Sequence, residues 1–213
     1  MLTLHYAAGT CALASHILLE QTGARYDAVR MDFASNAQRS PEFLRLNPKG
    51  RVPTLVTERG VLTETPAILL YLCQTFPQAG LAPLDDPFAL AEAQAFNSYL
   101  CSTVHVAHAH GRRASRWADE PEAIAAMQKK MPQNMAECFE LIEHQMFRGP
   151  WVMGEHYGLC DPYLFTIAGW LERDQVEPGR VGVEGDHLGP GVDALVGAPG
   201  AGEHHLVAED RAE

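Results

Sequence analysis

The sequence predicts an α/β domain followed by an all-α domain, for three reasons. Strand-like alternation and helical repeats follow one another in short segments along residues 1–76. The stretch "PQAGLAPLDDP" at residues 77–87 is rich in proline and has no periodic pattern. Residues 88–173 then carry apolar side chains at helical spacing over long stretches. We therefore expect a domain over residues 1–79, a linker over residues 80–87 and a helical domain over residues 88–173.

The first half begins with a strand, a helix and a second strand. Residues 1–6 alternate between polar and apolar side chains, and "RYDAVRMD" at residues 25–32 does the same, so both are predicted strands. Between them, residues 11–22 repeat apolar positions at helical spacing. Thr10 is the expected N-cap of this helix, and Gly23 is the expected glycine that ends it.

A short helix, a β-hairpin and another helix complete this half. "SPEFLRLN" predicts the short helix, and a proline and a glycine just beyond it end it. Residues 54–57 and 61–63 are the expected strands of the hairpin, joined by a tight turn. Thr65 then caps the last helix, with Pro66 as its first residue. The resulting order, βαβαββα, is that of a thioredoxin-like domain.

The second half is predicted to be helical up to residue 173. Helices are expected over residues 88–110, 121–147 and 161–171, the last of them strongly apolar. Residues 174–213 differ, because they are rich in glycine and carry only scattered valine and leucine. Such a segment buries too little apolar surface to offset the entropy lost on ordering it. We expect no helices there, and its composition is compatible with disorder.

Composition excludes several classes of function. The formal net charge of −11 argues against nucleic-acid binding, which needs clustered lysine and arginine. The start of the chain lacks the pattern of a signal peptide, and no stretch is long and apolar enough to span a membrane. The five cysteines form neither a CxxC pair nor a zinc pattern. We therefore expect a cytoplasmic protein with reduced cysteines and no membrane or nucleic-acid partner.

Five motifs together resemble one protein family. They are "LTLHYAAGTCALASHILLE", "NPKGRVPTL", "LTETPAILLYL", "STVH" and "CDPYLFTIAGW", all of them in register within residues 1–173. This combination resembles the bacterial glutathione transferases, and is most like the beta class. The resemblance implies a thioredoxin-like domain, the family's α-helical domain and a homodimer. It also implies detoxifying conjugation of a hydrophobic electrophile, with glutathione as co-substrate and no metal.

The resemblance implies which residues bind glutathione. The bond between Val52 and Pro53 would be cis, and the N–H and C=O groups of Val52 would pair with the cysteinyl unit of the tripeptide. Thr65, at the start of a helix, would bind the γ-glutamyl carboxylate. Glu64 would accept a hydrogen bond from the γ-glutamyl amine.

A second group of residues would act on the sulfur of glutathione. Cys11 matches the family's cysteine, and would hydrogen-bond the thiolate or form a mixed disulfide with it. Thr10 stands where relatives have a serine and offers a second donor. His105 matches the family's histidine, and would stabilise the thiolate or polarise the electrophile. These three residues are the predicted catalytic groups.

Five further residues are predicted to contact substrate. Trp170 matches an aromatic residue of the electrophile pocket, and His108 stands where an aromatic residue is frequent in relatives. Ser98 replaces an asparagine of the family, and Phe33 lies close to the glutathione motifs in the sequence. Asn36 stands where a lysine is often available for the glycyl carboxylate, so we expect only neutral donors for that group.

Three alternative functions remain open from the sequence. The chain could be a non-catalytic, ligand-binding or degenerate member of the same fold. It could also be a glutathione-dependent thiol-disulfide reductase that uses Cys11. A weaker alternative is a zinc or copper site, because Cys101, His105 and His108 follow one another at helical spacing with His110 nearby.

Overall fold

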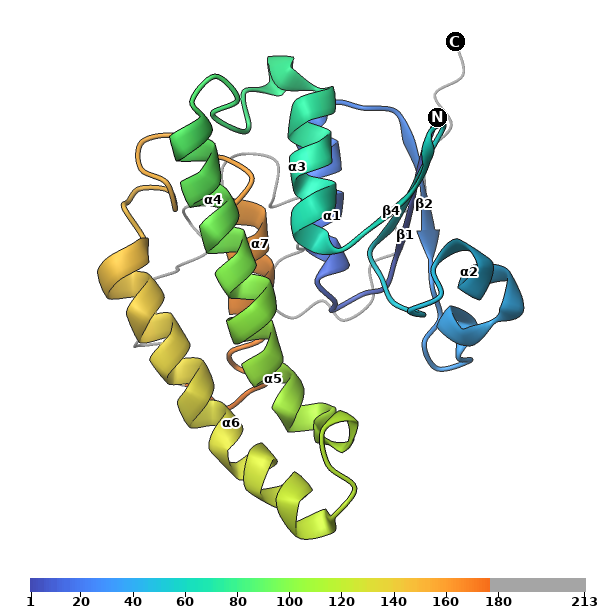
Figure 1. Ribbon diagram of the computed structural model, residues 1–213, viewed down its shortest axis with the longest axis vertical. Helices are drawn as coiled ribbons and strands as arrows, with labels where there is room; N and C mark the ends of the chain where they lie inside the picture. The colour runs from blue at the N-terminus through green and yellow to red at the C-terminus, as the bar shows by residue number, and fades with distance from the viewer. Residues whose placement is uncertain (177–213) are drawn as a thin grey trace.

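The computed structural model describes residues 1–176, and its first half is built on one mixed β-sheet (Figure 1). The strand order is β2-β1-β3-β4, in which β1 is parallel to β2 and antiparallel to β3, and β3 is antiparallel to β4. The four strands are β1 (Leu2–Tyr6), β2 (Tyr26–Arg30), β3 (Thr54–Thr57) and β4 (Gly60–Thr63).

Three helices cover the two faces of this sheet. They are α1 (Ala12–Thr22), α2 (Pro41–Leu46) and α3 (Thr65–Thr75). Figure 1 shows α1 and α3 together on one face, whereas α2 lies on the other. The element order is therefore βαβαββα, which confirms the predicted thioredoxin-like fold. Gly23 ends α1 in the left-handed conformation, with a φ of 67°, as the sequence predicts.

The starts of two helices differ from the prediction by one residue. Helix α1 has Cys11 as its N-cap instead of Thr10, and the Cys11 side chain makes no capping hydrogen bond; the Thr10 hydroxyl, one residue further out, accepts a 3.3 Å hydrogen bond from the N–H of Ala12. Helix α3 has Glu64 as its N-cap, and Thr65 is its first residue. Both shifts bring a predicted site residue closer to a helix N-terminus.

The second half of the described chain is helical, as predicted, but two of its helices change type along their length. The expected helices over residues 88–110 and 121–147 each contain a π-helical segment, at Leu100–Val104 and Ile142–Met146. Such segments keep an apolar periodicity close to that of an α-helix, so the pattern alone does not reveal them. The α-helices are α4 (Pro87–Tyr99), α5 (His105–Arg112), α6 (Pro121–Leu141) and α7 (Asp161–Ala168).

The sheet and the helical part share one hydrophobic core. Leu4, Leu18 and Leu69 from the sheet part are fully buried, and they belong to the same cluster of side chains as Leu100 and Tyr163 from the helices. Helix α7 packs directly on α1. The two parts therefore hold each other in a defined orientation, which positions the residues that lie between them.

The segment expected to lack order is ordered at its beginning. Asp174 and Val176 are both buried, and Val176 belongs to the main core. No helix lies among residues 174–176, and the rest of the predicted segment, residues 177–213, lies outside the described residues. Across the described part of the chain, no helix is long and apolar enough to cross a membrane.

Candidate functional site

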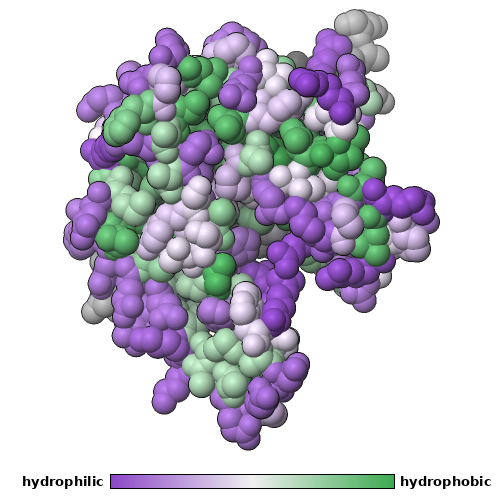
Figure 2. All heavy atoms as spheres, in the orientation of Figure 1, coloured by the Kyte–Doolittle hydropathy of each residue, from purple (hydrophilic) through white to green (hydrophobic). Residues whose placement is uncertain are grey.

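A cavity of about 760 Å³ opens between the end of the sheet and the helical part. Figure 2 shows the hollow between the lower helical region and the region that carries α2, with hydrophilic residues along its rim. The volume is in the range of ligand-binding pockets. We call it the central cavity, and its walls include Cys11, Val52, Thr65, His105, Arg113 and Trp170.

Most of the predicted site residues line the central cavity, although they come from distant parts of the sequence. Asn36 and Ser98 are the exceptions, because both are exposed and neither contributes to its walls. Phe33 lies at its edge with 41% of its surface exposed. The predicted residues on the walls are Thr10, Cys11, Phe33, Val52, Pro53, Glu64, Thr65, His105, His108 and Trp170.

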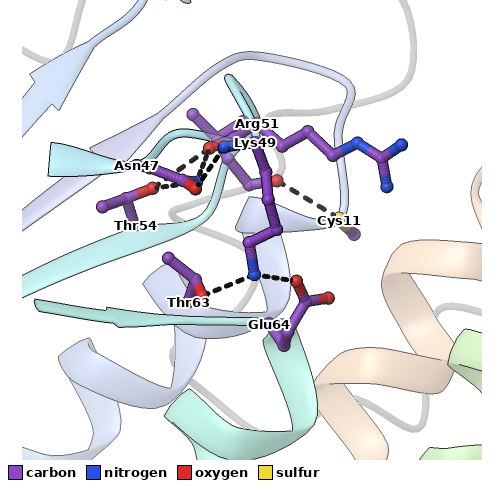
Figure 3. Close-up of polar contacts among 8 residues, drawn as sticks. Cys11, Asn47, Lys49, Arg51, Thr54, Thr63 and Glu64 are labelled. Carbon is purple, nitrogen blue, oxygen red and sulfur yellow. Dashed lines mark hydrogen bonds and ion pairs between the residues drawn. The ribbon is translucent and has the colours of Figure 1, made fainter. Parts of the chain in front are cut away.

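Cys11 lies at the N-terminus of α1 with its thiol directed at the neighbouring loop. Its Sγ atom is 3.7 Å from the carbonyl oxygen of Val52, to which it donates (Figure 3). Burial raises the pKa of the Cys11 thiol, while the hydroxyl of Thr65 and the charge of Arg113 act in the opposite direction without cancelling it. The thiol is thus a neutral hydrogen-bond donor at neutral pH.

The hydroxyl of Thr10 is used within the loop that precedes α1. It donates a 2.7 Å hydrogen bond to the carbonyl oxygen of Ala7, and it accepts from the N–H of Ala12 at 3.3 Å. Thr10 therefore shapes the loop that presents Cys11 to the cavity.

The loop before β3 presents the Val52 backbone to the central cavity. The bond between Val52 and Pro53 is cis, as the resemblance implies. Asn47 holds this loop from behind, because its side-chain amide donates to the carbonyl oxygen of Arg51 at 2.7 Å and to the Thr54 hydroxyl at 3.0 Å (Figure 3). Asn47 is buried, so these bonds lie away from competing water.

The N-terminus of α3 opens onto the same cavity. Glu64 precedes it with a φ of 73°, a conformation that side-chain-bearing residues rarely adopt and that is found at functional sites. Lys49 donates to the Glu64 carboxylate, and also to the Thr63 hydroxyl at 2.7 Å (Figure 3). Thr65 is buried at the first position of the helix, where unpaired N–H groups create an anion-binding position.

An aromatic wall on the helical side faces Cys11 and Val52 across the cavity. The ring of Trp170 stacks on His108 with centroids 4.4 Å apart, and its centroid is 5.0 Å from that of His105. Burial lowers the pKa of His105 to about 3, and the positive charge of Arg113 adds to this effect. His105 is therefore a neutral imidazole at physiological pH.

Six arginines line the central cavity, and the sequence pattern did not predict them as site residues. They are Arg39, Arg51, Arg112, Arg113, Arg116 and Arg173. Arg39 and Arg51 lie on the wall near Gly50, so charged donors are present in the cavity besides the neutral donors that the sequence predicts. The signal was partly visible in "HGRRASRW", where basic residues cluster in a chain of net charge −11.

The metal alternative gains no support from the positions of its candidate ligands. Cys101, His105 and His108 all line the cavity. Within residues 1–176, however, no group of three or more histidine, cysteine or acidic side chains is placed to hold a metal ion. His108 is instead engaged by Asp174, whose Oδ2 atom lies 2.5 Å from its Nδ1 atom.

Comparisons with known proteins agree with this geometry. Residues 2–74 match the N-terminal domain family of the glutathione S-transferases. A glutathione transferase homologue from Sulfitobacter, solved with bound glutathione, is 44% identical with a TM-score of 0.81, over 84% of this chain and 86% of its own. The beta-class glutathione S-transferase of Sphingomonas chungbukensis is 30% identical with a TM-score of 0.66, over 87% of this chain and 90% of its own. Glutathione S-transferase GST-4.5 of Xanthomonas campestris is 26% identical over 82% of this chain and 84% of its length.

The two structural matches cover most of this chain, so the similarity extends beyond the N-terminal domain into the helical part. Together with a thioredoxin-like sheet and a cavity between the sheet and the helices, they establish that this chain belongs to the glutathione transferase family.

Proposed function

We propose that the protein conjugates glutathione to an electrophile. The observation that carries the proposal is that the Cys11 thiol, the backbone beside the cis bond at Val52 and the N-terminus of α3 open onto one cavity. The relative from Sulfitobacter binds glutathione, which supports the same ligand here. In this proposal residues 1–79 bind the tripeptide, and residues 88–173 supply the wall that the second substrate contacts.

Each polar part of glutathione has a complementary group in the cavity. The Val52 backbone pairs with the cysteinyl unit, as an added strand would. The N-terminus of α3 and Thr65 bind the γ-glutamyl carboxylate, while Glu64 accepts from the γ-glutamyl amine. Arg51 lies beside Val52 and, with Arg39, binds the glycyl carboxylate.

The sulfur of glutathione is activated as a thiolate. On binding, the neutral Cys11 thiol turns its one proton from the Val52 carbonyl to this thiolate, and the nearby charge of Arg113 favours the ionised form. The thiolate attacks an electrophilic carbon, a C–S bond forms, and the leaving group departs with the electron pair of its bond. His105, which is neutral, contacts the electrophile through its ring instead of acting as a charged group.

A thiol-disulfide reductase is the second candidate function, because Cys11 places a sulfur in the cavity. The raised pKa of the Cys11 thiol weighs against it, since the thiolate is the attacking species in disulfide exchange. Conjugation needs only the thiolate of glutathione, so we favour conjugation. A non-catalytic member of the fold would bind glutathione without turnover.

We also propose that the protein is a cytoplasmic homodimer. Phe88, at the start of α4, exposes 75% of its surface, which is unusual for a large apolar side chain. Covering it in a subunit interface would remove this area from water. Sedimentation equilibrium of the wild type and of Phe88→Asp tests this, and a wild-type protein that is monomeric at micromolar concentration contradicts it.

The rate of glutathione conjugation to chlorodinitrobenzene is the direct test of the proposed function. We expect turnover well above the uncatalysed rate, and a KM for glutathione raised about tenfold or more by Glu64→Gln, because a charge-assisted hydrogen bond is lost. Glu155→Gln, at an exposed position outside the cavity, is the matched control and keeps the wild-type KM. A wild-type rate equal to the blank contradicts the proposal.

A further inference from the structure

We propose that the second substrate of this enzyme is an organic carboxylate with a planar, apolar body. The inference rests on the proposed function, because it names the class of molecule that shares the central cavity with glutathione. It is carried by the arginines of the cavity wall and by the aromatic rings between them. A neutral electrophile gives no reason for so many cations in one pocket.

The central cavity is strongly positive in a protein that is negative overall. The formal net charge of the chain is −11, yet six arginines line the cavity and Glu64 is the one acidic residue on its described walls. Glu64 is moreover paired with Lys49. A basic pocket in an acidic chain attracts small anions and repels large polyanions, whose other parts meet the negative surface.

Within the described part of the chain, no carboxylate forms an ion pair that neutralises these arginines. Arg113 is half-buried as a residue, but its Nε atom is fully buried. This atom has no hydrogen-bond partner among the described residues. Burial lowers the pKa of Arg113, and the repulsion of Arg116 lowers it further. The guanidinium remains charged, so an incoming anion would relieve both effects.

Glutathione uses only part of this charge. Its thiolate form carries about two negative charges at neutral pH, and Glu64 is already paired with Lys49, so about four of the six arginine charges stay uncompensated. Its glycyl carboxylate lies on the side of Arg39 and Arg51. Figure 3 shows the Arg51 side chain extending away from the Asn47 cluster toward the side on which Cys11 lies.

The remaining arginines come from the helical side of the cavity. Arg112 ends α5, and Arg113 and Arg116 follow in the next turn, while Arg173 comes after α7. The rings of His105, Trp117 and Trp170 lie on the same side of the cavity; this set of residues is the second subsite. Flat ring faces suit a planar body, and guanidinium groups suit a carboxylate at its end.

Binding of two matched probes tests this inference without requiring turnover. The probes are para-chloro-meta-nitrobenzoate and the corresponding benzamide, which share shape and ring but differ in charge. The protein is saturated with S-methylglutathione, which has no thiol and cannot react, and quenching of tryptophan fluorescence is titrated. We expect the benzoate to bind about tenfold or more tightly than the benzamide, because each charge-assisted hydrogen bond is worth about this factor.

Variants identify the groups responsible for this preference. Arg113→Gln with Arg116→Gln removes two guanidinium groups of the second subsite, and we expect the benzoate to lose about tenfold or more in affinity while the benzamide changes less than about twofold. Arg59→Gln, in the exposed turn between β3 and β4, lies outside the cavity and keeps the preference. In the wild type, raising the salt concentration to about 0.5 M weakens benzoate binding more than benzamide binding.

The outcomes separate this inference from the proposed function. Equal affinities for the two probes, or a benzoate preference that survives in the double arginine variant, overturn the carboxylate assignment even where chlorodinitrobenzene is turned over. A benzoate preference without any turnover supports the anion subsite and contradicts conjugation. Turnover of the two probes is compared as the ratio of the catalysed to the uncatalysed rate with glutathione. This ratio corrects for the different chemical reactivity of the two rings.

Discussion

The Nδ1 atom of His108 lies 2.5 Å from the Oδ2 atom of Asp174, and both side chains are buried. An arginine can only donate, so the 3.3 Å contact between Arg173 Nη2 and His108 Nε2 makes Nε2 an acceptor. The ring proton is then on Nδ1 and points at Asp174. This bond ties α5 to the segment after α7, and it holds the ring that stacks on Trp170.

Replacing Asp174 tests how far this bond supports the fold. Asp174→Asn keeps the shape of the side chain but removes the charge, so we expect the free energy of unfolding to fall by about 1–3 kcal/mol. Urea denaturation measures the change, with the exposed Glu172→Gln as the control. An unchanged midpoint would show that the bond between His108 and Asp174 contributes nothing to stability.

The contact between His108 and Asp174 also shows what cannot be predicted from the sequence. Asp174 stands at the start of a Gly-rich segment, and the apolar content of such a segment predicts that it does not fold. Its burial depends on His108, which lies 66 positions earlier in the chain. Spacing along the chain carries no information about such a contact.

The elements that sequence reasoning predicted well are those defined by local rules. Strand alternation, the left-handed Gly23 and the start of α3 near Thr65 follow from short segments, and all are present to within one or two residues. The cavity wall is different, because Arg51 and Arg113 come from separate parts of the fold and line one cavity only after the helical part packs on the sheet part. The positive charge that they create together depends on the tertiary structure, so the sequence pattern does not predict it.

His105 predicts a dependence of stability on pH. Its pKa is lowered to about 3 in the folded protein, whereas the unfolded chain has the ordinary value of about 6.5. The unfolded state therefore binds more protons between these values, and folding stability falls as the pH decreases below about 6.5. We expect His105 to account for a loss on the order of 1–2 kcal/mol between pH 7 and pH 5.

The variant His105→Gln isolates this contribution, because glutamine does not titrate. Its unfolding free energy should decrease less steeply between neutral and mildly acid pH than that of the wild type. Some slope remains, since burial also lowers the pKa of His5 and His16. The exposed His156→Gln serves as the control and keeps the wild-type slope. Parallel curves for His105→Gln and the wild type would contradict the assignment.

Substitution of Cys11 distinguishes conjugation from disulfide reduction. Serine retains a hydrogen-bond donor, so we expect Cys11→Ser to keep kcat/KM for conjugation within about tenfold of the wild type. Alanine has no donor, and Cys11→Ala should be slower than Cys11→Ser. Both variants should lack any glutathione-dependent reduction of a mixed disulfide. A complete loss of conjugation in a folded Cys11→Ser variant would show that a hydroxyl donor cannot replace the thiol, and would contradict the proposed role of Cys11.

The raised pKa of Cys11 gives an independent measurement. A neutral thiol reacts slowly with iodoacetamide, so we expect alkylation of Cys11 at pH 7 to be slower than that of free cysteine and to accelerate as the pH increases. Peptide mass spectrometry assigns the modified residue. Rapid, pH-independent alkylation near neutrality would show a thiolate, and would favour the reductase.

Asp161, the first residue of α7, supports the helix that packs on α1. Its Oδ1 atom accepts from the N–H of Val152 at 2.8 Å, and its Oδ2 atom accepts from the N–H of Gly158 at 2.7 Å. Asparagine has one carbonyl oxygen and an amide that cannot accept, so Asp161→Asn leaves one buried N–H without a partner. We expect the free energy of unfolding to fall by about 1–3 kcal/mol in urea denaturation. Asp85→Asn, at an exposed position before α4, should leave it unchanged, and equal midpoints for the two variants would show that this pair of bonds does not support α7.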